Sequence, residues 1–230
     1  MIVLMNTIDR SKSNLKVKQR TKKKVEKNTF AKARRVIEKN IIKDANLIFG
    51  IDNGATGTTA CVCSDYNYID FQETPIIESY DYTQDVQKMN RVDFNVLKKW
   101  FEKHINFVST LYKTPIKIIV ILERPMVNPQ RFKQSGYALR AFEATLIVLE
   151  MLNLNYVIID SKKWQHHFFG KDTTQVDLKK ASKEKSFKIL TEYEKDNIYD
   201  LDFKRMKDVL EKHKDGDGLL ICYYTKEKLI

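Results

Sequence analysis

Cysteines and long apolar runs are scarce in this chain, and each scarcity excludes a class of protein. Three cysteines in 230 residues cannot build a disulfide framework, which is typical of a reducing compartment. No run approaches the ~20 apolar residues of a membrane span, and the opening MIVLM is too short for the apolar region of a signal peptide. We therefore expect a cytoplasmic protein without a membrane partner.

The chain does contain enough apolar side chains for a core. Hydrophobic residues make up 43% of the sequence, and 230 residues allow one sizeable domain with an appendage. Cys61 and Cys63 lie two apart in a strand-like stretch and share a face. Because two further ligands are not nearby in sequence, we interpret them as small core residues and not as zinc ligands.

Positive charge is concentrated at the start of the chain. Residues 1–44 hold 14 Lys and Arg against 4 Asp and Glu, whereas residues 45–230 hold 27 against 26. A basic arm on a nearly neutral body suggests contact with a polyanion, most often nucleic acid, although a solvated tail that aids solubility has the same composition. We place the domain boundary between the arm (1–44), flexible or partly helical, and the domain (45–230).

The first part of the domain has the pattern of a strand meander. LIFGID and TTACVC are apolar runs joined by a Gly-containing turn, which predicts a hairpin of buried strands. NYIDFQET follows as a third strand. The polar stretch from Ile77 to Asn90 is expected to be a surface loop.

Helices and strands alternate after this meander. Helical spacing begins near Val92, where one side of a helix is predicted to carry Val92, Val96, Trp100, Phe107 and Leu111. IKIIVILE is apolar throughout and predicts a central strand that ends at Glu123. The later elements are expected to be a helix from Tyr137 to Leu152, a strand in NYVIID, a short helix in SKKWQHHFFG, a Lys-rich helix from Gln175 to Glu192 and a closing helix in GLLICYYTKEKL. The polar stretch before Asp215 receives no assignment. The whole pattern predicts an α/β fold with a mixed sheet flanked by helices.

Three acidic residues stand at the ends of separated apolar segments. Asp52 follows LIFGI, Glu123 ends the central strand, and Asp217 opens the closing helix. A carboxylate at the edge of a buried strand costs several kcal/mol unless it is paired or holds a metal, so three such residues suggest a shared cation. Singly, Asp52 could be a solvated turn residue and Asp217 a helix cap. Together they can hold two divalent ions about 4 Å apart, one activating water and one stabilising a leaving oxygen.

The ordered set of motifs resembles the RuvC-like Holliday junction resolvases, particularly the phage-type members, which have an RNase H-like fold. The resemblance spans Leu47 to Leu229 and rests on five segments, taken in chain order: GIDNGATG, VILERP, YVIIDSKKWQHHFFG, LKKASKEKSFKIL and HKDGDGLLICYY. It implies that Asp52, Glu123 and Asp217 are catalytic, metal-binding carboxylates.

The fourth acidic position is left open by this resemblance. Another Asp, sometimes a His, usually precedes the last Asp by three or four positions, and Lys214 and His213 occupy those positions here. Either His213 or Asp215 can supply the group, because His can bind a metal or shuttle a proton while Asp offers a harder oxygen ligand. We favour Asp215 slightly.

The resemblance implies an endonuclease that cuts Holliday junctions or other branched DNA during recombination, repair or phage DNA processing. Its expected cofactor is Mg²⁺, two ions in number, for which Mn²⁺ can substitute, and no small-molecule substrate is expected. A homodimer is expected, with the apolar face of the helix from Tyr137 to Leu152 as the interface. If the chain is viral, its compartment is the host cytoplasm. Candidate DNA contacts are Arg131, Lys133, Arg140, Lys162, Lys163, Lys179, Lys180 and Lys183.

Two other functions remain compatible with the sequence. A branched-DNA-binding protein that has lost catalysis would keep the same fold, and metal-dependent cleavage separates it from the enzyme. An ATP-binding protein of the actin-like class is suggested by IDNGATGTT, but it needs a second half-domain that 186 residues can scarcely hold.

Overall fold

The computed structural model describes residues 45–80, 86, 88–171, 175–213 and 215–229. The predicted basic arm over 1–44 lies outside these residues, so its role stays a prediction. No helix in the described part of the chain is long and apolar enough to cross a membrane.

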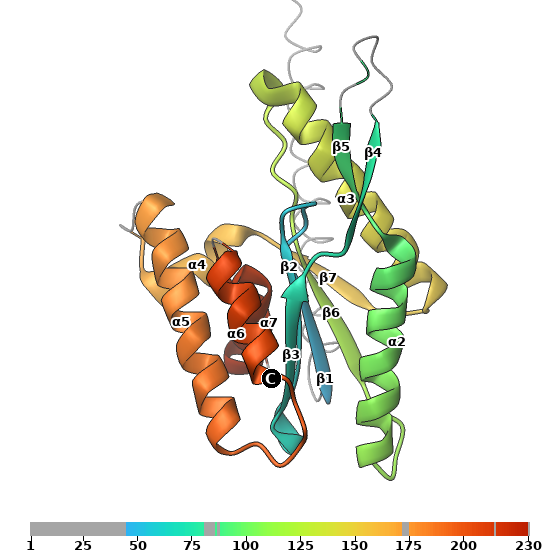
Figure 1. The fold of residues 1–230 in the computed structure, drawn as a ribbon, viewed down its shortest axis with the longest axis vertical. Helices are drawn as coiled ribbons and strands as arrows, with labels where there is room; N and C mark the ends of the chain where they lie inside the picture. Colours follow the sequence, from blue (N-terminus) through green and yellow to red (C-terminus); the bar gives the residue numbers. More distant parts are fainter. Residues whose placement is uncertain (1–44, 81–85, 87, 172–174, 214, 230) are drawn as a thin grey trace, which may run out of the picture. The chain divides into compact units, whose positions relative to one another are not determined.

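A five-stranded mixed sheet forms the centre of the domain (Figure 1). Its strands are β1 (Leu47–Ile51), β2 (Thr58–Cys63), β3 (Tyr68–Glu73), β6 (Ile118–Glu123) and β7 (Tyr156–Ile159). Their order across the sheet is β3-β2-β1-β6-β7. The first three strands pair antiparallel as a meander, whereas β6 lies parallel to β1 and β7 lies parallel to β6. This is the predicted α/β fold, with a mixed sheet flanked by helices.

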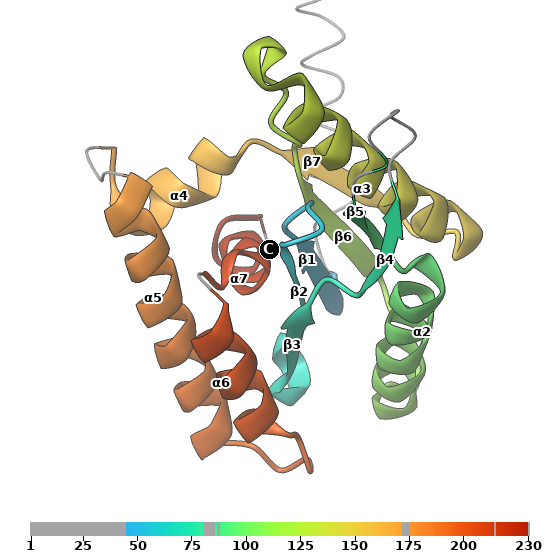
Figure 2. The ribbon, with the colours of Figure 1, turned by 45° about the horizontal axis from the view of Figure 1, so that its top comes forward.

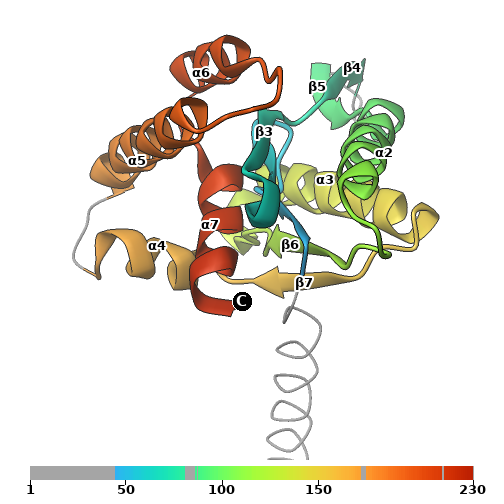
Figure 3. The same cartoon turned by 90° about the horizontal axis from the view of Figure 1, so that it is seen from below.

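Helices cover both faces of this sheet (Figure 3). One face carries α2 (Phe94–Leu111) and α3 (Phe132–Met151), and the other carries α7 (Asp217–Leu229) with α5 (Gln175–Lys195) and α6 (Phe203–Lys212). The short helix α4 (Ser161–Phe169) follows β7 and contacts α7 and α5 (Figure 2). Covered on both faces, β1, β2 and the middle of β6 are fully buried, which explains why their sequences are continuous apolar runs.

The alternation of side chains along each strand divides the core into two layers. Phe49, Cys61, Cys63 and Leu122 point to the side of α2 and α3, where they join one hydrophobic cluster. Cys222 of α7 contacts the opposite side, since its thiol lies 3.6 Å from the carbonyl oxygen of Ile48. All three cysteines are buried and free, so Cys61 and Cys63 are core residues, as predicted.

The predicted surface loop from Ile77 to Asn90 is wrong. Strands β4 (Ile76–Tyr80) and β5 (Lys88–Val92) pair antiparallel in a separate two-stranded sheet. All of β4 and most of β5 are at least partly exposed, so neither has the buried apolar pattern that identifies a strand in sequence. The hairpin packs through β5 on α3.

The predicted helices exist, but one buried face and several boundaries differ. Val92, predicted in the first of these helices, instead ends strand β5, and α5 ends three residues after the predicted Glu192. Helix α2 buries Leu97, Trp100, Phe101, His104 and Val108. Val96, which we predicted on the buried side, is exposed, because Leu97 lies one position on and shares a face with Trp100 and Phe101. Helix α3 begins at Phe132, five residues before the predicted start.

Helix α6 was not predicted, although its sequence has the pattern of a helix. Asp202 caps its first turn by accepting a hydrogen bond from the backbone N–H of Arg205 at 2.8 Å. Its buried side chains are Phe203, Met206 and Leu210, at helical spacing. The charged residues between them give the stretch a polar composition, which hid this apolar side.

A buried polar network joins β3, α2 and α6. The carboxylate of Asp70 accepts a hydrogen bond from Trp100 Nε1 at 2.9 Å and lies 3.0 Å from His104 Nε2. It also accepts a hydrogen bond from Arg205, whose second guanidinium nitrogen donates to the carbonyl oxygen of Phe71. Each oxygen of this carboxylate therefore has a partner, as a buried charge requires.

Candidate active site

Asp52 and Glu123 lie at the same edge of the sheet because their strands are parallel neighbours. Strand β1 pairs with β6 in the register Ile51 to Leu122, so the next residue of each strand is the acidic one. The side-chain amide of Asn53 donates to the backbone oxygen of Glu123 at 2.6 Å, which ties the turn after β1 to β6. The carboxyl ends of neighbouring parallel strands are where open α/β sheets bind ligands.

Two glycines bring the first turn of α7 to this edge. A Cβ on Gly50 would clash with the carbonyl oxygen of Gly218, and a Cβ on Gly218 would clash with the backbone of Thr58. Only glycine allows this approach of helix to strand. The backbone N–H of Gly218 also donates to Thr58 Oγ1 at 3.0 Å. Asp217, the preceding residue, is thereby held beside the end of β1.

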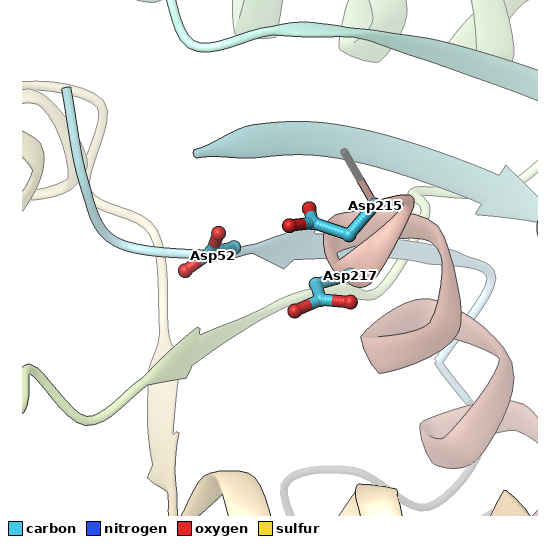
Figure 4. Close-up of side chains that lie close together, drawn as sticks. All are labelled: Asp52, Asp215 and Asp217. Carbon is cyan, nitrogen blue, oxygen red and sulfur yellow. The ribbon is translucent and has the colours of Figure 1, made fainter. Parts of the chain in front are cut away.

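Three aspartates form a compact group at this place. One carboxylate oxygen from each of Asp52, Asp215 and Asp217 lies within 4.8 Å of the others, and Figure 4 shows the three side chains gathered around a common space. Asp215 Oδ1 is buried and has no hydrogen-bond partner among the residues that the structure describes. An unpaired buried carboxylate oxygen is costly, and a cation in this space would satisfy it.

The electrostatics of the group favour a cation as well. Burial raises the pKa of Asp52 well above its ordinary value of 3.8, and the charges of Glu123 and Asp215 raise it further. Burial also raises the pKa of Asp217, with Asp215 and Asp52 as the next causes. Burial and the charges of Asp217 and Asp215 raise the pKa of Glu123 to about 7. These carboxylates resist ionising together, and a bound divalent ion would reverse the effect.

The chemistry of the donors selects among metals. The group offers carboxylate oxygens from Asp52, Asp215 and Asp217, with Glu123 adjacent and coupled to them by charge. Oxygen-only ligand sets suit hard cations such as Mg²⁺ and Mn²⁺, whereas zinc and copper prefer nitrogen and sulfur. The residues therefore fit the metal that the resemblance implies.

Neighbouring side chains fix two of the carboxylates. Trp164, almost fully buried in α4, donates from Nε1 to Glu123 Oε2 at 2.9 Å. Ser182 of α5 donates from its hydroxyl to Asp217 Oδ1 at 2.6 Å. From the sequence, Trp164 is interpreted only as a packing residue, and no serine is singled out. A small serine among the lysines of LKKASKEKSFKIL is the one sequence signal for Ser182, and its burial is seen only in the structure.

A pocket of about 670 Å³ opens over the acidic group. Its lining comprises Asp52, Thr56, Glu123, Met126, Ser161, Lys162, Trp164, Gln165, Phe169, Leu178, Lys179, Lys212, His213, Asp215 and Asp217. Three lysines thus stand around four carboxylates, and Lys212 was not among the predicted residues. A pocket with this charge arrangement can hold cations at its acidic end and phosphate oxygens at the lysines.

The two candidates for the fourth position are placed differently. Asp215 belongs to the acidic group. His213 also lines the pocket, but its Nε2 lies 3.3 Å from Glu73 Oε1 at the end of β3. The geometry thus brings Asp215, and not His213, together with Asp52 and Asp217.

The predicted DNA-contacting residues are spread over several elements. Lys162 of α4 and Lys179 of α5 line the acidic pocket, while Lys163 is exposed on α4 outside it. Lys180 pairs with Glu184 at 3.9 Å, and Lys183 donates to the carbonyl oxygen of Glu211 at 2.8 Å.

The remaining basic candidates belong to η2 (Pro129–Arg131) and α3. Arg131 is exposed at the end of η2, and Lys133 lies 6.0 Å from the ring centre of Tyr137. Arg140 lines a second pocket between β5 and α3, where it donates to Met89 Sδ at 3.3 Å. These three residues do not line the acidic pocket.

Comparisons with known proteins give only distant likenesses. No family model matches this chain, and no curated protein matches it in sequence. Among solved structures, the chain is similar to RuvC of T. thermophilus in complex with a Holliday junction substrate, with 9% identity and a TM-score of 0.36 over 80% of this chain and 96% of that one. A second Thermus thermophilus RuvC structure gives 11% identity and a TM-score of 0.31 over 79% and 96%. Because both TM-scores are low, function has to be inferred from the topology and side chains of this chain.

Proposed function

We propose that this protein is a metal-dependent endonuclease that cuts Holliday junctions or other branched DNA. The observation that carries the proposal is the group of Asp52, Asp215 and Asp217, with Glu123 beside it, in a pocket that also has lysines around it. Carboxylates that hold divalent ions next to cationic side chains are what phosphodiester hydrolysis requires.

Each part of the pocket has a role in this proposal. Asp52, Asp215 and Asp217 would hold Mg²⁺ or Mn²⁺, and Glu123 would complete the site. The bound ions would supply activation of water and stabilisation of the leaving oxygen. Lys162, Lys179 and Lys212, all on the pocket lining, would orient the scissile strand through its phosphates.

A four-way junction contains two strands that must be cut symmetrically, so we propose that the enzyme acts as a two-fold homodimer. The buried residues of α3, including Ala141, Val148 and Leu149, pack inside the protein's own core. Leu139, Ile147 and Met151 of the same helix remain exposed, and these are the apolar side chains that α3 offers to a second copy. We expect it to act in the cytoplasm during recombination, repair or phage DNA processing.

A labelled synthetic four-way junction tests the proposal. It is incubated with the protein in Mg²⁺, in Mn²⁺ and in EDTA, beside a linear duplex of the same sequence and the Asp52→Asn variant. We expect paired symmetric nicks in the junction only, which require both the metal and Asp52. The variant should still bind the junction nearly as well as the wild type.

Two other results would point elsewhere. Junction binding without cleavage in either metal would favour a DNA-binding protein without catalysis. ATP binding would favour the actin-like alternative. The topology disfavours that alternative, because the described residues form one five-stranded sheet and a two-stranded hairpin instead of two similar half-domains.

A further inference from the structure

Helix α5 is hydrogen-bonded to the segment that carries Asp215 and Asp217. The hydroxyl of Ser182, which is 2% exposed, donates to Asp217 Oδ1 at 2.6 Å and accepts from the backbone N–H of Gly216 at 3.2 Å. One turn further along α5, the fully buried Ser186 donates to the carbonyl oxygen of Gly216 at 3.3 Å. Two serines on one side of the helix thus share the segment between the two aspartates.

The packing at Gly216 leaves this segment little freedom. A Cβ on Gly216 would clash with the side chain of Ser186, so the backbone approaches α5 as closely as glycine allows. The two serines nevertheless differ in what they contact. Ser186 reaches only backbone, whereas Ser182 reaches a carboxylate oxygen of the acidic group.

A hydroxyl donor at 2.6 Å from a carboxylate is a short, charge-assisted hydrogen bond. Such a bond fixes the rotation of the carboxylate and occupies one of its oxygens, which leaves the other oxygen for a cation. The contact is shielded from water because Ser182 is buried, and therefore water cannot easily replace it.

From these contacts we infer that Ser182 is a positioning residue, which orients Asp217 for the divalent ion through its hydroxyl. This inference rests on the proposed function, because it assigns Asp217 to the metal site. It adds that α5, which brings Lys179 to the acidic pocket, also sets the geometry of one of its carboxylates.

The test compares Ser182→Ala with Ser186→Ala. Each variant removes one buried hydroxyl from the same side of α5, so both should lose stability to a similar extent in urea denaturation. Only Ser182→Ala should change metal binding. Loss of a side chain that orients a metal ligand typically weakens metal affinity about 10- to 100-fold. We expect the affinity of Ser182→Ala for Mn²⁺, measured by electron paramagnetic resonance titration, to fall by this factor. Ser186→Ala should stay within about twofold of the wild type.

Further variants separate the hydroxyl from the volume of the side chain. Ser182→Cys offers only a weak donor, so it should bind Mn²⁺ as poorly as Ser182→Ala. Because cysteine nearly fills the volume of serine, this variant should stay folded even if Ser182→Ala unfolds. Ser182→Thr keeps the hydroxyl and should recover most of the affinity. In cleavage of the junction, kcat should fall with Mn²⁺ affinity while KM for the DNA stays unchanged.

Three results would contradict these expectations in distinguishable ways. Wild-type affinity in Ser182→Ala and Ser182→Cys would overturn the role of Ser182 and leave the proposed function standing. Equal weakening in Ser182→Ala and Ser186→Ala would mean that both serines are merely structural. No Mn²⁺ binding by the wild-type protein would overturn the proposed function, and the inference with it.

Discussion

Asp70 and Asp52 lie in or directly after strands of the same sheet, yet the first carboxylate is surrounded by donors and the second by other carboxylates. Burial raises the pKa of Asp70, but hydrogen bonding and charge from His104, together with Arg205 and Trp100, outweigh it and lower the pKa below 3.8. For Asp52 nearby negative charges add to the effect of burial, and the pKa is raised.

The difference separates a structural carboxylate from a candidate functional one. The cost of desolvating Asp70 is offset within the protein, so this residue needs no ligand. The acidic group at the end of β1 and β6 leaves Asp215 Oδ1 without a partner and keeps like charges together. Such an arrangement costs stability and is kept where a ligand compensates for it.

The largest expected effect comes from removing a carboxylate of the acidic group. Asp215→Asn should reduce junction cleavage by roughly 10³-fold, because several kcal/mol of metal-dependent stabilisation are lost. His213→Ala should stay within about tenfold of the wild type, since His213 faces Glu73. Both losses are measured as single-turnover cleavage rates in saturating Mg²⁺. A larger loss in His213→Ala than in Asp215→Asn would make His213 the fourth active-site residue.

Breaking the Asp70 network should affect stability and leave the active site intact. Asp70→Ala removes the partner of Trp100, His104 and Arg205, and we expect a loss of about 3 kcal/mol in the free energy of unfolding. The side chain of Arg205 is 39% exposed, which keeps the loss at the lower end of the range for buried pairs. Urea denaturation measures the loss, and cleavage per folded molecule should remain near the wild-type value.

The pH dependence of the Asp70 contribution has a definite sign. Its folded-state pKa is lowered from 3.8, so the stabilisation is present above the unfolded pKa and is lost as the pH falls through the folded pKa. The difference in stability between wild type and Asp70→Ala should therefore shrink below pH 4. If the difference in the free energy of unfolding stays constant down to the pH of acid unfolding, the ionised carboxylate of Asp70 is not what stabilises the fold.

Glu123 should show the opposite dependence on pH. Its pKa is raised from 4.5 to about 7, so its contribution to stability is fully present below pH 4.5 and is lost as the pH rises through about 7. In EDTA at pH 8, Glu123→Gln should thus be more stable than the wild type, by roughly 1–2 kcal/mol after allowance for solvent screening. Thermal unfolding at pH 4.5 and pH 8 is the measurement.

Magnesium provides the control for this prediction. Adding Mg²⁺ at pH 8 should stabilise the wild type more than Glu123→Gln and should release protons, since metal ions compete with protons for carboxylates. If the variant is less stable than the wild type at both pH values in EDTA, the view of Glu123 as an uncompensated carboxylate is wrong.

The smallest expected effects concern the lysines. Lys162 lines the pocket, whereas the Lys180 side chain is 82% exposed and pairs with Glu184. Lys162→Ala should weaken junction binding about threefold and reduce the salt dependence by about one phosphate contact, while Lys180→Ala should change little. Each lysine change is combined with Asp52→Asn so that the junction is not cleaved, and junction binding is measured at several salt concentrations. Equal effects of the two variants would argue against contact between the pocket lysines and DNA.

Much of the fold could be predicted because its strands are buried on both faces. Continuous apolar runs identified β1, β2 and β6 directly. The hairpin of β4 and β5 could not be recognised in this way, since most of its side chains face solvent and do not alternate regularly with buried ones. Helix α6 could have been predicted from the Asp202 cap and the spacing of its apolar residues, but its charged residues concealed the pattern.

The candidate site was predictable only in part. The ends of two parallel strands bring Asp52 and Glu123 together, and an apolar run that ends in an acidic residue is visible in sequence. The place of Asp217 depends on the glycine contact between α7 and β1, which is a long-range packing feature that sequence alone does not fix. The support from Ser182 and Trp164 likewise depends on the packing of α5 and α4.

The most direct test of the acidic group as a metal site is an anomalous difference map from a crystal of the protein soaked in Mn²⁺. We expect a peak among the carboxylates of Asp52, Asp215 and Asp217, within direct bonding distance of their oxygens, and no peak in crystals of Asp52→Asn. A map with Mn²⁺ bound elsewhere and nothing among these three aspartates would contradict it.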